Sequence, residues 1–376
     1  MKPNLEDIIA LSRYYGRDPE WVIAGGGNTS VKSEDTLMIK ASGTSLGSAA
    51  PESFVAIDRL RLASVWSKAY PEDVEKRESE ALQDLMDARP EGESLRPSVE
   101  TGMHDVFPQR LVVHTHPTLV NGLTCSQGGE RIAREIFGDE IIWIPSINPG
   151  YILSKRVQEE IEGFTGRFGR SPDLLFLENH GLTVAGETRE DIHRLHRSVT
   201  EALLRRVGRE PDLAGADIDL EHAERVKVAL SESFRAVAGA EAVVLFDTTA
   251  ELLSRAASAE TTAPLLEPFS PDHIVYAGHA PLYVEESGEA ADLFERAAKA
   301  HGVPPKSVVV RGLGLFTLGT SHKVAETARM LFRDAVKIAS YAESFGGPKA
   351  MAPEEVAFIR GWEVERFRAN VSLDGR

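Results

Sequence analysis

The run from Leu111 to Pro117 constrains the fold of this chain more than any other stretch. Apolar, β-branched residues lead into His114 and His116, and Pro117 follows. This composition predicts a buried strand that the proline ends, because proline cannot donate to a ladder. Alternate side chains on a strand share a face, so both imidazoles leave the sheet on one side. The pair therefore predicts a metal site at a strand end, with surface or packed histidines as the alternative.

Length and charge narrow the class of protein. The 376 residues predict two domains or one enlarged domain. The formal charge of −16, from 42 basic and 58 acidic residues, argues against binding to nucleic acid or to an anionic membrane. The single Cys125 rules out a disulfide within the chain, and no signal peptide or membrane-spanning run is recognised. These features predict a soluble, cytoplasmic protein.

Three further segments accompany the histidine pair. His180 ends a second apolar strand, and Glu100 lies shortly upstream of the histidine strand. Two loops of small residues, 25–30 and 41–44, offer backbone amides that can cradle a phosphate group. Three histidines with an open fourth position are typical of catalytic zinc, and a carboxylate beside them can be a fourth ligand or a general base.

Five short motifs in this order resemble those of the class II aldolase/adducin family. They are Gly27–Ser30, Ala41–Thr44, Pro97–Glu100, His114–His116 and Asn179–Leu182. The resemblance covers residues from about 5 to 207. It implies an α/β fold with three layers (α/β/α) around a mainly antiparallel sheet, similar to zinc-dependent fuculose- and rhamnulose-1-phosphate aldolases. It also implies a homo-oligomer, usually a tetramer.

The resemblance assigns roles to individual residues. One zinc ion per chain would be held by His114, His116 and His180, and Glu100 would be the acid/base carboxylate. Tyr151 is a candidate for the tyrosine that protonates the leaving aldehyde, with a packed loop tyrosine as the alternative. The residues expected to bind the substrate and its phosphate are Asn28, Ser30, Ser42, Gly43 and Ser98.

The implied activity is retro-aldol cleavage of a ketose phosphate to dihydroxyacetone phosphate and an aldehyde, through a zinc-stabilised enediolate. An epimerase, dehydratase or decarboxylase of a phosphorylated sugar or sugar acid is the alternative on the same metal site. Val99 stands where family aldolases commonly carry a second serine, so one expected phosphate hydroxyl is missing. A non-catalytic, adducin-like scaffold is the alternative of another class, although such domains lose the histidines kept here.

The C-terminal half repeats a theme of the N-terminal half. Residues 307–320 align with residues 173–188 as strand, glycine turn and strand before a long helix, which sets His180 opposite Leu313. Two unrelated segments with glycine turns can also look alike, which is the alternative. The alignment predicts a degenerate copy of the first fold that has lost its metal ligands.

The repeat suggests a division of the chain into domains. We expect a catalytic domain at residues 1–210, a linker at 211–220, and the metal-free copy at 221–376, which would serve oligomerisation or cover the active site. A weaker alignment sets His114–His116 opposite Tyr276–Gly278. It predicts a strand at that place in the second half.

Overall fold

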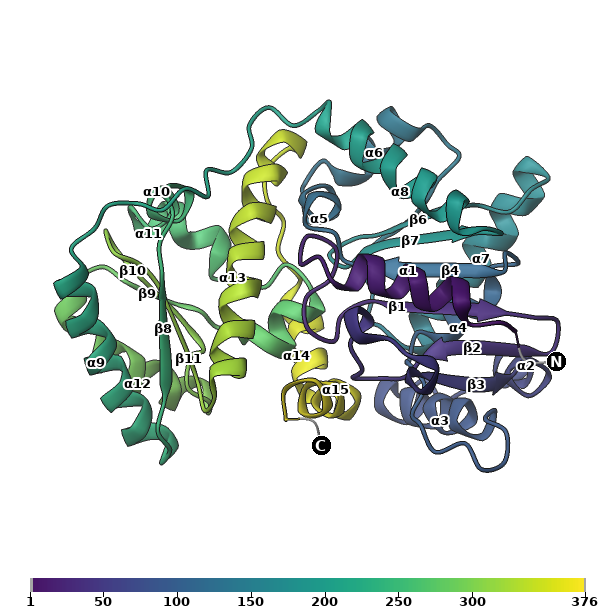
Figure 1. The fold of residues 1–376 in the computed structure, drawn as a ribbon, viewed down its shortest axis with the longest axis horizontal. Coiled ribbons are helices and arrows are strands. Elements are labelled where there is room, and N and C mark those ends of the chain that lie inside the picture. Colours follow the sequence, from purple (N-terminus) through teal and green to yellow (C-terminus); the bar gives the residue numbers. More distant parts are fainter. Residues whose placement is uncertain (1–2, 375–376) are drawn as a thin grey trace. The chain divides into compact units, whose positions relative to one another are not determined.

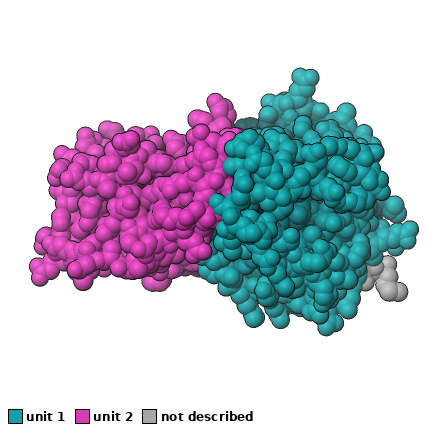
Figure 2. Space-filling model, turned by 90° about the horizontal axis from the view of Figure 1, so that it is seen from above, with its two compact units in different colours: residues 1–124, 129–206, 362–376 teal, residues 125–128, 207–361 magenta. Residues whose placement is uncertain are grey.

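The computed structural model describes residues 3–374, which form two compact units (Figures 1 and 2). Unit 1 contains the described residues up to 124, residues 129–206 and those from 362 onward, and unit 2 contains residues 125–128 and 207–361. The C-terminal segment is therefore part of the same unit as the N-terminal half. Among the described residues, no helix is both long and apolar enough to cross a membrane. The division into a catalytic and a metal-free domain stays a prediction.

A mixed, seven-stranded sheet forms the centre of unit 1, in the order β3-β2-β1-β4-β7-β6-β5. The strands are β1 (Asn28–Lys32), β2 (Thr36–Lys40), β3 (Phe54–Asp58), β4 (Leu111–Thr115), β5 (Ile142–Ile144), β6 (Leu174–Leu177) and β7 (Gly181–Gly186). Every neighbouring pair is antiparallel except β5 and β6. The predicted α/β fold with a mainly antiparallel sheet is confirmed for this unit. The histidine strand β4 lies at its centre, between β1 and β7.

Helices cover both faces of this sheet (Figure 1). One face carries α1 (Glu6–Gly16), α5 (Thr118–Thr124), α6 (Gly129–Phe137) and α8 (Arg189–Leu204). The other carries α2 (Arg59–Ser67), α3 (Val74–Asp87), α4 (Thr101–Val106) and α7 (Tyr151–Phe168). Strand β1 shows the two sides, because Thr29 bonds to Ser12 of α1 while Ser30 bonds to His104 of α4. Helix α15 (Glu363–Asp374) completes the unit.

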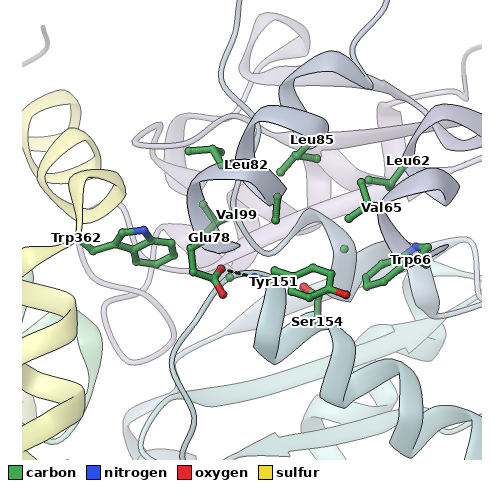
Figure 3. Close-up of a pocket in the computed structure, with 13 residues that line it drawn as sticks. Leu62, Val65, Trp66, Glu78, Leu82, Leu85, Val99, Tyr151, Ser154 and Trp362 are labelled. Carbon is green, nitrogen blue, oxygen red and sulfur yellow. Dashed lines mark hydrogen bonds between the residues drawn. The ribbon is translucent and has the colours of Figure 1, made fainter. Parts of the chain in front are cut away.

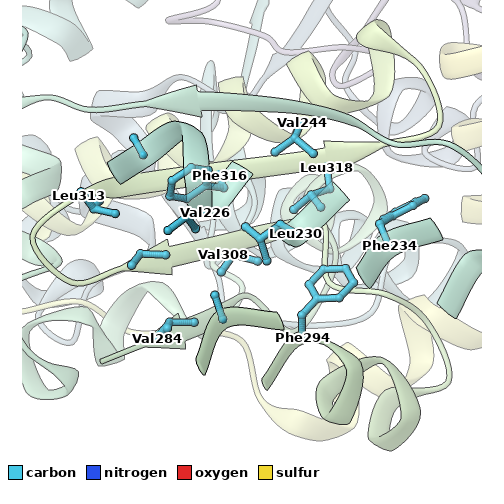
Figure 4. Close-up of a cluster of buried hydrophobic side chains, with 13 residues drawn as sticks. Val226, Leu230, Phe234, Val244, Val284, Phe294, Val308, Leu313, Phe316 and Leu318 are labelled. Atoms are coloured by element: carbon cyan, nitrogen blue, oxygen red, sulfur yellow. The ribbon is translucent and has the colours of Figure 1, made fainter. Parts of the chain in front are cut away.

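Unit 2 is built on a four-stranded sheet in the order β8-β11-β10-β9. Its strands are β8 (Val243–Asp247), β9 (Leu282–Val284), β10 (Ser307–Val310) and β11 (Gly314–Gly319). Its helices are α9 (Leu220–Ala238), α10 (Ala250–Arg255), α11 (Ala259–Thr262), α12 (Ala290–His301), α13 (His322–Ala342) and α14 (Pro353–Gly361). Apolar side chains from α9 and α12 pack against one face of the sheet (Figure 4). This burial gives unit 2 a hydrophobic core of its own.

The strand pairing of unit 2 follows that of β4 to β7 in unit 1. Strands β10 and β11 are antiparallel, as β6 and β7 are, and β9 runs parallel to β10, as β5 does to β6. Strand β8 pairs antiparallel with β11, as β4 does with β7. In the matching turns, Asn179 and Gly312 both have positive φ, at 53° and 69°. The predicted alignment of these two strand–turn–strand segments agrees with this pairing.

The weaker alignment, of His114–His116 with Tyr276–Gly278, is wrong. Residues His273–Ala277 form a helical turn rather than a strand, because Pro271 presets the helical φ at its start. Strand β8 takes the position of β4 instead. In the β4–β7 and β8–β11 registers, His114 corresponds to Phe246. By the same register, His116 corresponds to Thr248.

Candidate metal centre and active site

Three imidazoles meet at the end of β4. The Nε2 atom of His114 lies 3.0 Å from that of His116 and 3.4 Å from that of His180, and all three residues are buried. Asn179, a non-glycine residue with φ of 53°, turns the chain between β6 and β7 and brings His180 to this point. Glycine is required next, since a Cβ on Gly181 would lie 2.4 Å from the Thr115 carbonyl oxygen. The predicted metal residues are thus brought together.

The geometry of the triad fits a divalent metal such as zinc. Ligands of tetrahedral zinc at about 2.0–2.1 Å lie about 3.3 Å apart, close to the separations between these nitrogens. The His114 Nδ1 atom lies 3.1 Å from both the Leu182 carbonyl and the Thr183 hydroxyl, so it donates its proton there and Nε2 keeps a lone pair. Burial lowers the pKa of His114 well below its usual range, which keeps the ring neutral. The buried His triad can therefore hold a divalent metal.

Glu100 directs one carboxylate oxygen at the triad. Its Oε1 atom lies 3.4 Å from His180 Nε2 and 3.8 Å from His114 Nε2, and it is buried without a hydrogen-bond partner. Burial raises the pKa of Glu100, but the neighbouring imidazoles and an amide donor outweigh this effect and hold it at about 2. The carboxylate is therefore ionised at neutral pH. An orphaned buried oxygen at this point is what a metal or a substrate proton would satisfy.

A chain of hydrogen bonds fixes the other oxygen of Glu100. The Asn28 amide donates to Glu100 Oε2 and to the Ser98 hydroxyl, the latter over 3.2 Å, and its own oxygen accepts from His104 Nε2. His104 Nδ1 in turn accepts from Ser30 Oγ at 2.8 Å. Burial lowers the pKa of His104 to about 3, so its ring stays neutral and has one donor and one acceptor. This network makes the NH2 group of Asn28, and not its oxygen, the end that meets the Glu100 carboxylate.

Strand β1 supplies the polar side of the site through simple alternation. Asn28, Ser30 and Lys32 share one face of the strand, and all three contact α4 or the residues just before it. The Lys32 ammonium donates to the carbonyl oxygens of His104, at 2.5 Å, and of Phe107. It therefore caps the last turn of α4, where carbonyls lack partners. In the sequence, the signal for this polar face was that Asn28, Ser30 and Lys32 alternate within a strand whose other residues are suited to burial.

Of the two loops expected to bind phosphate, loop 41–44 lies beside residues 96–98, and loop 25–30 reaches Ser98 through the Asn28 amide. The Ser42 amide donates to the Arg96 carbonyl at 2.9 Å, and Ala41 and Pro97 form an isolated bridge. Gly43 has φ of 78° and holds the tight turn. Helix α4 begins at Thr101 with Glu100 at its N-cap, so Ser98 lies in the loop before it. The Ser98 hydroxyl accepts a hydrogen bond from the Asn28 amide, and the Ser30 hydroxyl bonds to His104.

Tyr151 lies in an apolar pocket on α7 (Figure 3). Its ring centroid is 4.6 Å from that of Tyr70, and its amide donates to the buried Glu78 carboxylate at 2.8 Å. The pocket is also lined by Val99, the residue before the candidate base, and by Trp362. Burial raises the pKa of Tyr151. No hydrogen bond or ring contact found for Tyr151 links it to the three histidines, and its role as a proton donor stays a prediction.

Comparison with known families agrees with this site. A family model described as "Class II Aldolase and Adducin N-terminal domain" matches residues 6–203, which is more than half of the chain. The chain belongs to the class II aldolase and adducin family. All five motifs and the three histidines lie within the matched residues. Residues beyond 203 are an extension to the family domain.

Three individual proteins are similar to this chain. An uncharacterized oxidoreductase of Bacillus subtilis (strain 168), YuxG, is 22% identical over 417 residues, which cover 98% of this chain and 58% of YuxG. The N-terminal class II aldolase domain of a conserved Thermoplasma acidophilum protein is 26% identical, with a TM-score of 0.45, and covers 54% of this chain and 92% of that one. L-Fuculose-1-phosphate aldolase from Thermus thermophilus is 17% identical, with a TM-score of 0.34 and coverages of 55% and 97%. The chain thus spans somewhat more than half the length of its curated relative.

Proposed function

We propose that this family member is a metal-dependent aldolase that cleaves a ketose phosphate into dihydroxyacetone phosphate and an aldehyde. The observation that carries the proposal is the buried Glu100 Oε1, 3.4 Å from one triad nitrogen and 3.8 Å from another. A base at this distance from a metal position suits removal of a proton from a metal-bound substrate. The small-residue loop 41–44 beside Ser98 suits the phosphate group of such a substrate.

Each residue has a distinct task in this proposal. His114, His116 and His180 would hold the metal, which when bound polarises a carbonyl and stabilises developing negative charge. Glu100 Oε1 takes the substrate proton and returns it after the carbon–carbon bond breaks. The Asn28 amide holds Oε2 so that Oε1 stays directed at the reacting atoms. Ser42, Gly43 and Ser98 bind the phosphate group.

Metal content and product identity test the proposal. Purified protein should carry about one divalent metal per chain, and His114→Ala should lose it, while His196→Phe, at a buried histidine outside the site, should keep it. Glu100→Gln should keep the metal but lower turnover by roughly 10²–10⁴-fold, since the amide cannot accept the proton. A panel of ketose 1-phosphates should release dihydroxyacetone phosphate. Release of carbon dioxide or of an isomeric pentulose would instead identify a decarboxylase or an epimerase.

The scaffold alternative gives a different result in the same experiment. A non-catalytic interaction domain would contain no stoichiometric metal. In that protein His114→Ala would change neither stability nor any turnover. Retention of three buried histidines with a carboxylate directed at them argues for catalysis.

We further propose that unit 2 is a degenerate copy of the β4-to-α8 part of unit 1 and binds no metal. Its strand order and its turn at Gly312 support this proposal. The positions that correspond to the three histidines hold Phe246, Thr248 and Leu313, which cannot ligate zinc in the manner of imidazole. One active site per chain follows. Metal analysis tests this, since two metal ions per chain would contradict it.

A further inference from the structure

The C-terminal helix α15 lies on the loop that is proposed to bind phosphate. Its residues Glu363, Phe367 and Val371 are spaced by four and therefore share a helix face. Glu363 forms two hydrogen bonds with the Arg96 guanidinium, at 3.0 and 2.8 Å, and the Phe367 ring centroid lies 4.5 Å from the same guanidinium. A Cβ on Gly43 would lie 2.6 Å from Val371, so the helix packs directly on the turn.

Two cations flank this turn. The Lys40 side chain is buried, and its ammonium donates to the Thr44 carbonyl at 2.7 Å. The Arg96 backbone carbonyl accepts the Ser42 amide, so Arg96 lies directly beside the proposed phosphate loop 41–44. In a chain with a net charge of −16, a buried lysine and an arginine on either side of this small-residue turn mark a place suited to an anion. The anion that the structure shows there is the Glu363 carboxylate.

We infer that Arg96 recognises the anionic group of the substrate and that Glu363 is an internal carboxylate that occupies Arg96 until the substrate displaces it. The inference rests on the proposed function, because it takes the same loops as the substrate site. A guanidinium binds carboxylate and phosphate through the same planar pair of donors, so one anion can replace the other. Arg96 would also supply the contact that is lost where Val99 replaces a serine.

The exposure of the two partners suits displacement. The Arg96 side chain is 15% exposed and the Glu363 side chain 61%, so the carboxylate can return to water at little cost while the guanidinium stays in place. Because Glu363 is tethered, it competes as if present at about millimolar concentration. A phosphate dianion must therefore bind Arg96 more strongly than the tethered Glu363 carboxylate does. Ligands with less charge would not displace Glu363, so α15 would select for strongly charged ligands.

Phosphate binding to the full-length protein tests the inference. Titration calorimetry with inorganic phosphate should show about fivefold tighter binding to Glu363→Gln than to the wild type, as the competing pair is worth about as much as an exposed ion pair. Glu130→Gln is the matched control, since it also removes one glutamate from a two-bond pair with arginine, on α6. It should leave phosphate binding unchanged. Arg96→Gln should weaken binding more than tenfold, and Arg96→Lys should weaken it less.

Release of α15 gives a second measurement. Trypsin cleaves after arginine, and Arg366 lies exposed on this helix. Phosphate should accelerate cleavage there in the wild type, and Glu363→Gln should be cleaved faster without phosphate. Acetate at equal concentration should do much less, which distinguishes a phosphate monoester from a sugar-acid carboxylate as the recognised group. Equal acceleration by acetate would overturn the assignment of phosphate.

The outcomes separate this inference from the proposed function. If the enzyme cleaves a ketose phosphate but Glu363→Gln and the wild type bind phosphate equally, the inference is wrong and the aldolase proposal stands. If Arg96→Gln and Glu363→Gln shift phosphate binding in opposite directions but no ketose phosphate is cleaved, the anion site stands and the aldolase proposal is wrong. Absence of phosphate binding in every variant, Glu363→Gln included, overturns the inference.

Discussion

Acid should destabilise unit 1 through one buried histidine on α8 that is not part of the histidine triad. His196 is 1% exposed, its ring centroid lies 4.3 Å from that of Tyr15 and 5.1 Å from that of Trp21, and its Nδ1 donates to the Ile192 carbonyl at 3.0 Å. Its Nε2 atom is buried without a hydrogen-bond partner. Burial lowers the pKa of His196 from 6.5 to about 4, because a charged ring would lose its hydration there.

The magnitude follows from the difference in proton affinity between the two states. The unfolded chain binds the proton with a pKa of 6.5 and the folded one with a pKa of about 4, so protonation favours unfolding. The contribution of His196 to stability is complete above pH 6.5 and is lost as the pH falls from 6.5 towards 4. Each pH unit within this window costs about 1.4 kcal/mol, so about 2–3 kcal/mol should be lost between about pH 7.5 and about pH 4.5.

His196→Phe should remove this loss, since a phenyl ring fills similar space beside Tyr15 and Trp21 and does not titrate. The assay is urea unfolding at both pH values, followed by tryptophan fluorescence with a chelator present throughout. All four tryptophans lie in unit 1, so the signal reports that unit alone. His322→Asn, at an exposed histidine that begins α13, is the control and should behave as the wild type does. If His196→Phe loses as much stability in acid as the wild type, the reasoning from burial is refuted.

Three further predictions concern packing and buried charge. Gly181→Ala should destabilise unit 1 by about 1–3 kcal/mol and weaken metal binding, because the added methyl group meets the Thr115 carbonyl. The control is Gly163→Ala on α7, where the space around the glycine is open, and it should be neutral or stabilising in the same unfolding assay. Glu251→Gln should lower the free energy of unfolding of unit 2 by about 2 kcal/mol in urea followed by circular dichroism, because Arg209 and Arg255 lose their buried partner. The hydrogen bond from Arg209 is the main cause that lowers the pKa of Glu251 to about 2. The difference between the variant and the wild type should therefore vanish as the pH falls towards 2. Lys32→Met should lower turnover with little loss of metal, because it uncaps α4 behind the catalytic carboxylate; unchanged turnover would show that the cap is dispensable.

The sequence was sufficient to predict that His114, His116 and His180 come together, because each position depends on local geometry. A period of two on β4 fixes His114 and His116 on one face, and the Asn179–Gly181 turn fixes His180 at the end of the neighbouring strand. The order of motifs then predicted the family and the mainly antiparallel sheet. These inferences hold because strand alternation and tight turns leave few conformations open.

Features that depend on contacts distant in sequence were not predictable. The bond from Asn28 to His104 needs α4 to pack on β1, which no local pattern specifies. The pair of Arg96 with Glu363 joins residues 267 positions apart, and the division of the chain predicted from the repeat left α15 with the second half. The mistaken strand at Tyr276 arose from a weak alignment with the histidine strand, whereas a proline upstream starts a helical turn there.

In the proposed function, metal binding and proton transfer depend on different parts of unit 1, and this makes them separable. The ligands lie on β4 and on the turn between β6 and β7, which unit 2 repeats, whereas the Asn28 amide comes from β1, for which the described sheet of unit 2 has no counterpart beyond β8. Restoring the three side chains by Phe246→His, Thr248→His and Leu313→His would therefore rebuild a chelate without the strand that orients a base. On this proposal, one molecule contains a catalytic unit and a related fold without its metal ligands and its base-orienting strand. The second unit is then an internal reference against which the contribution of each catalytic part can be measured.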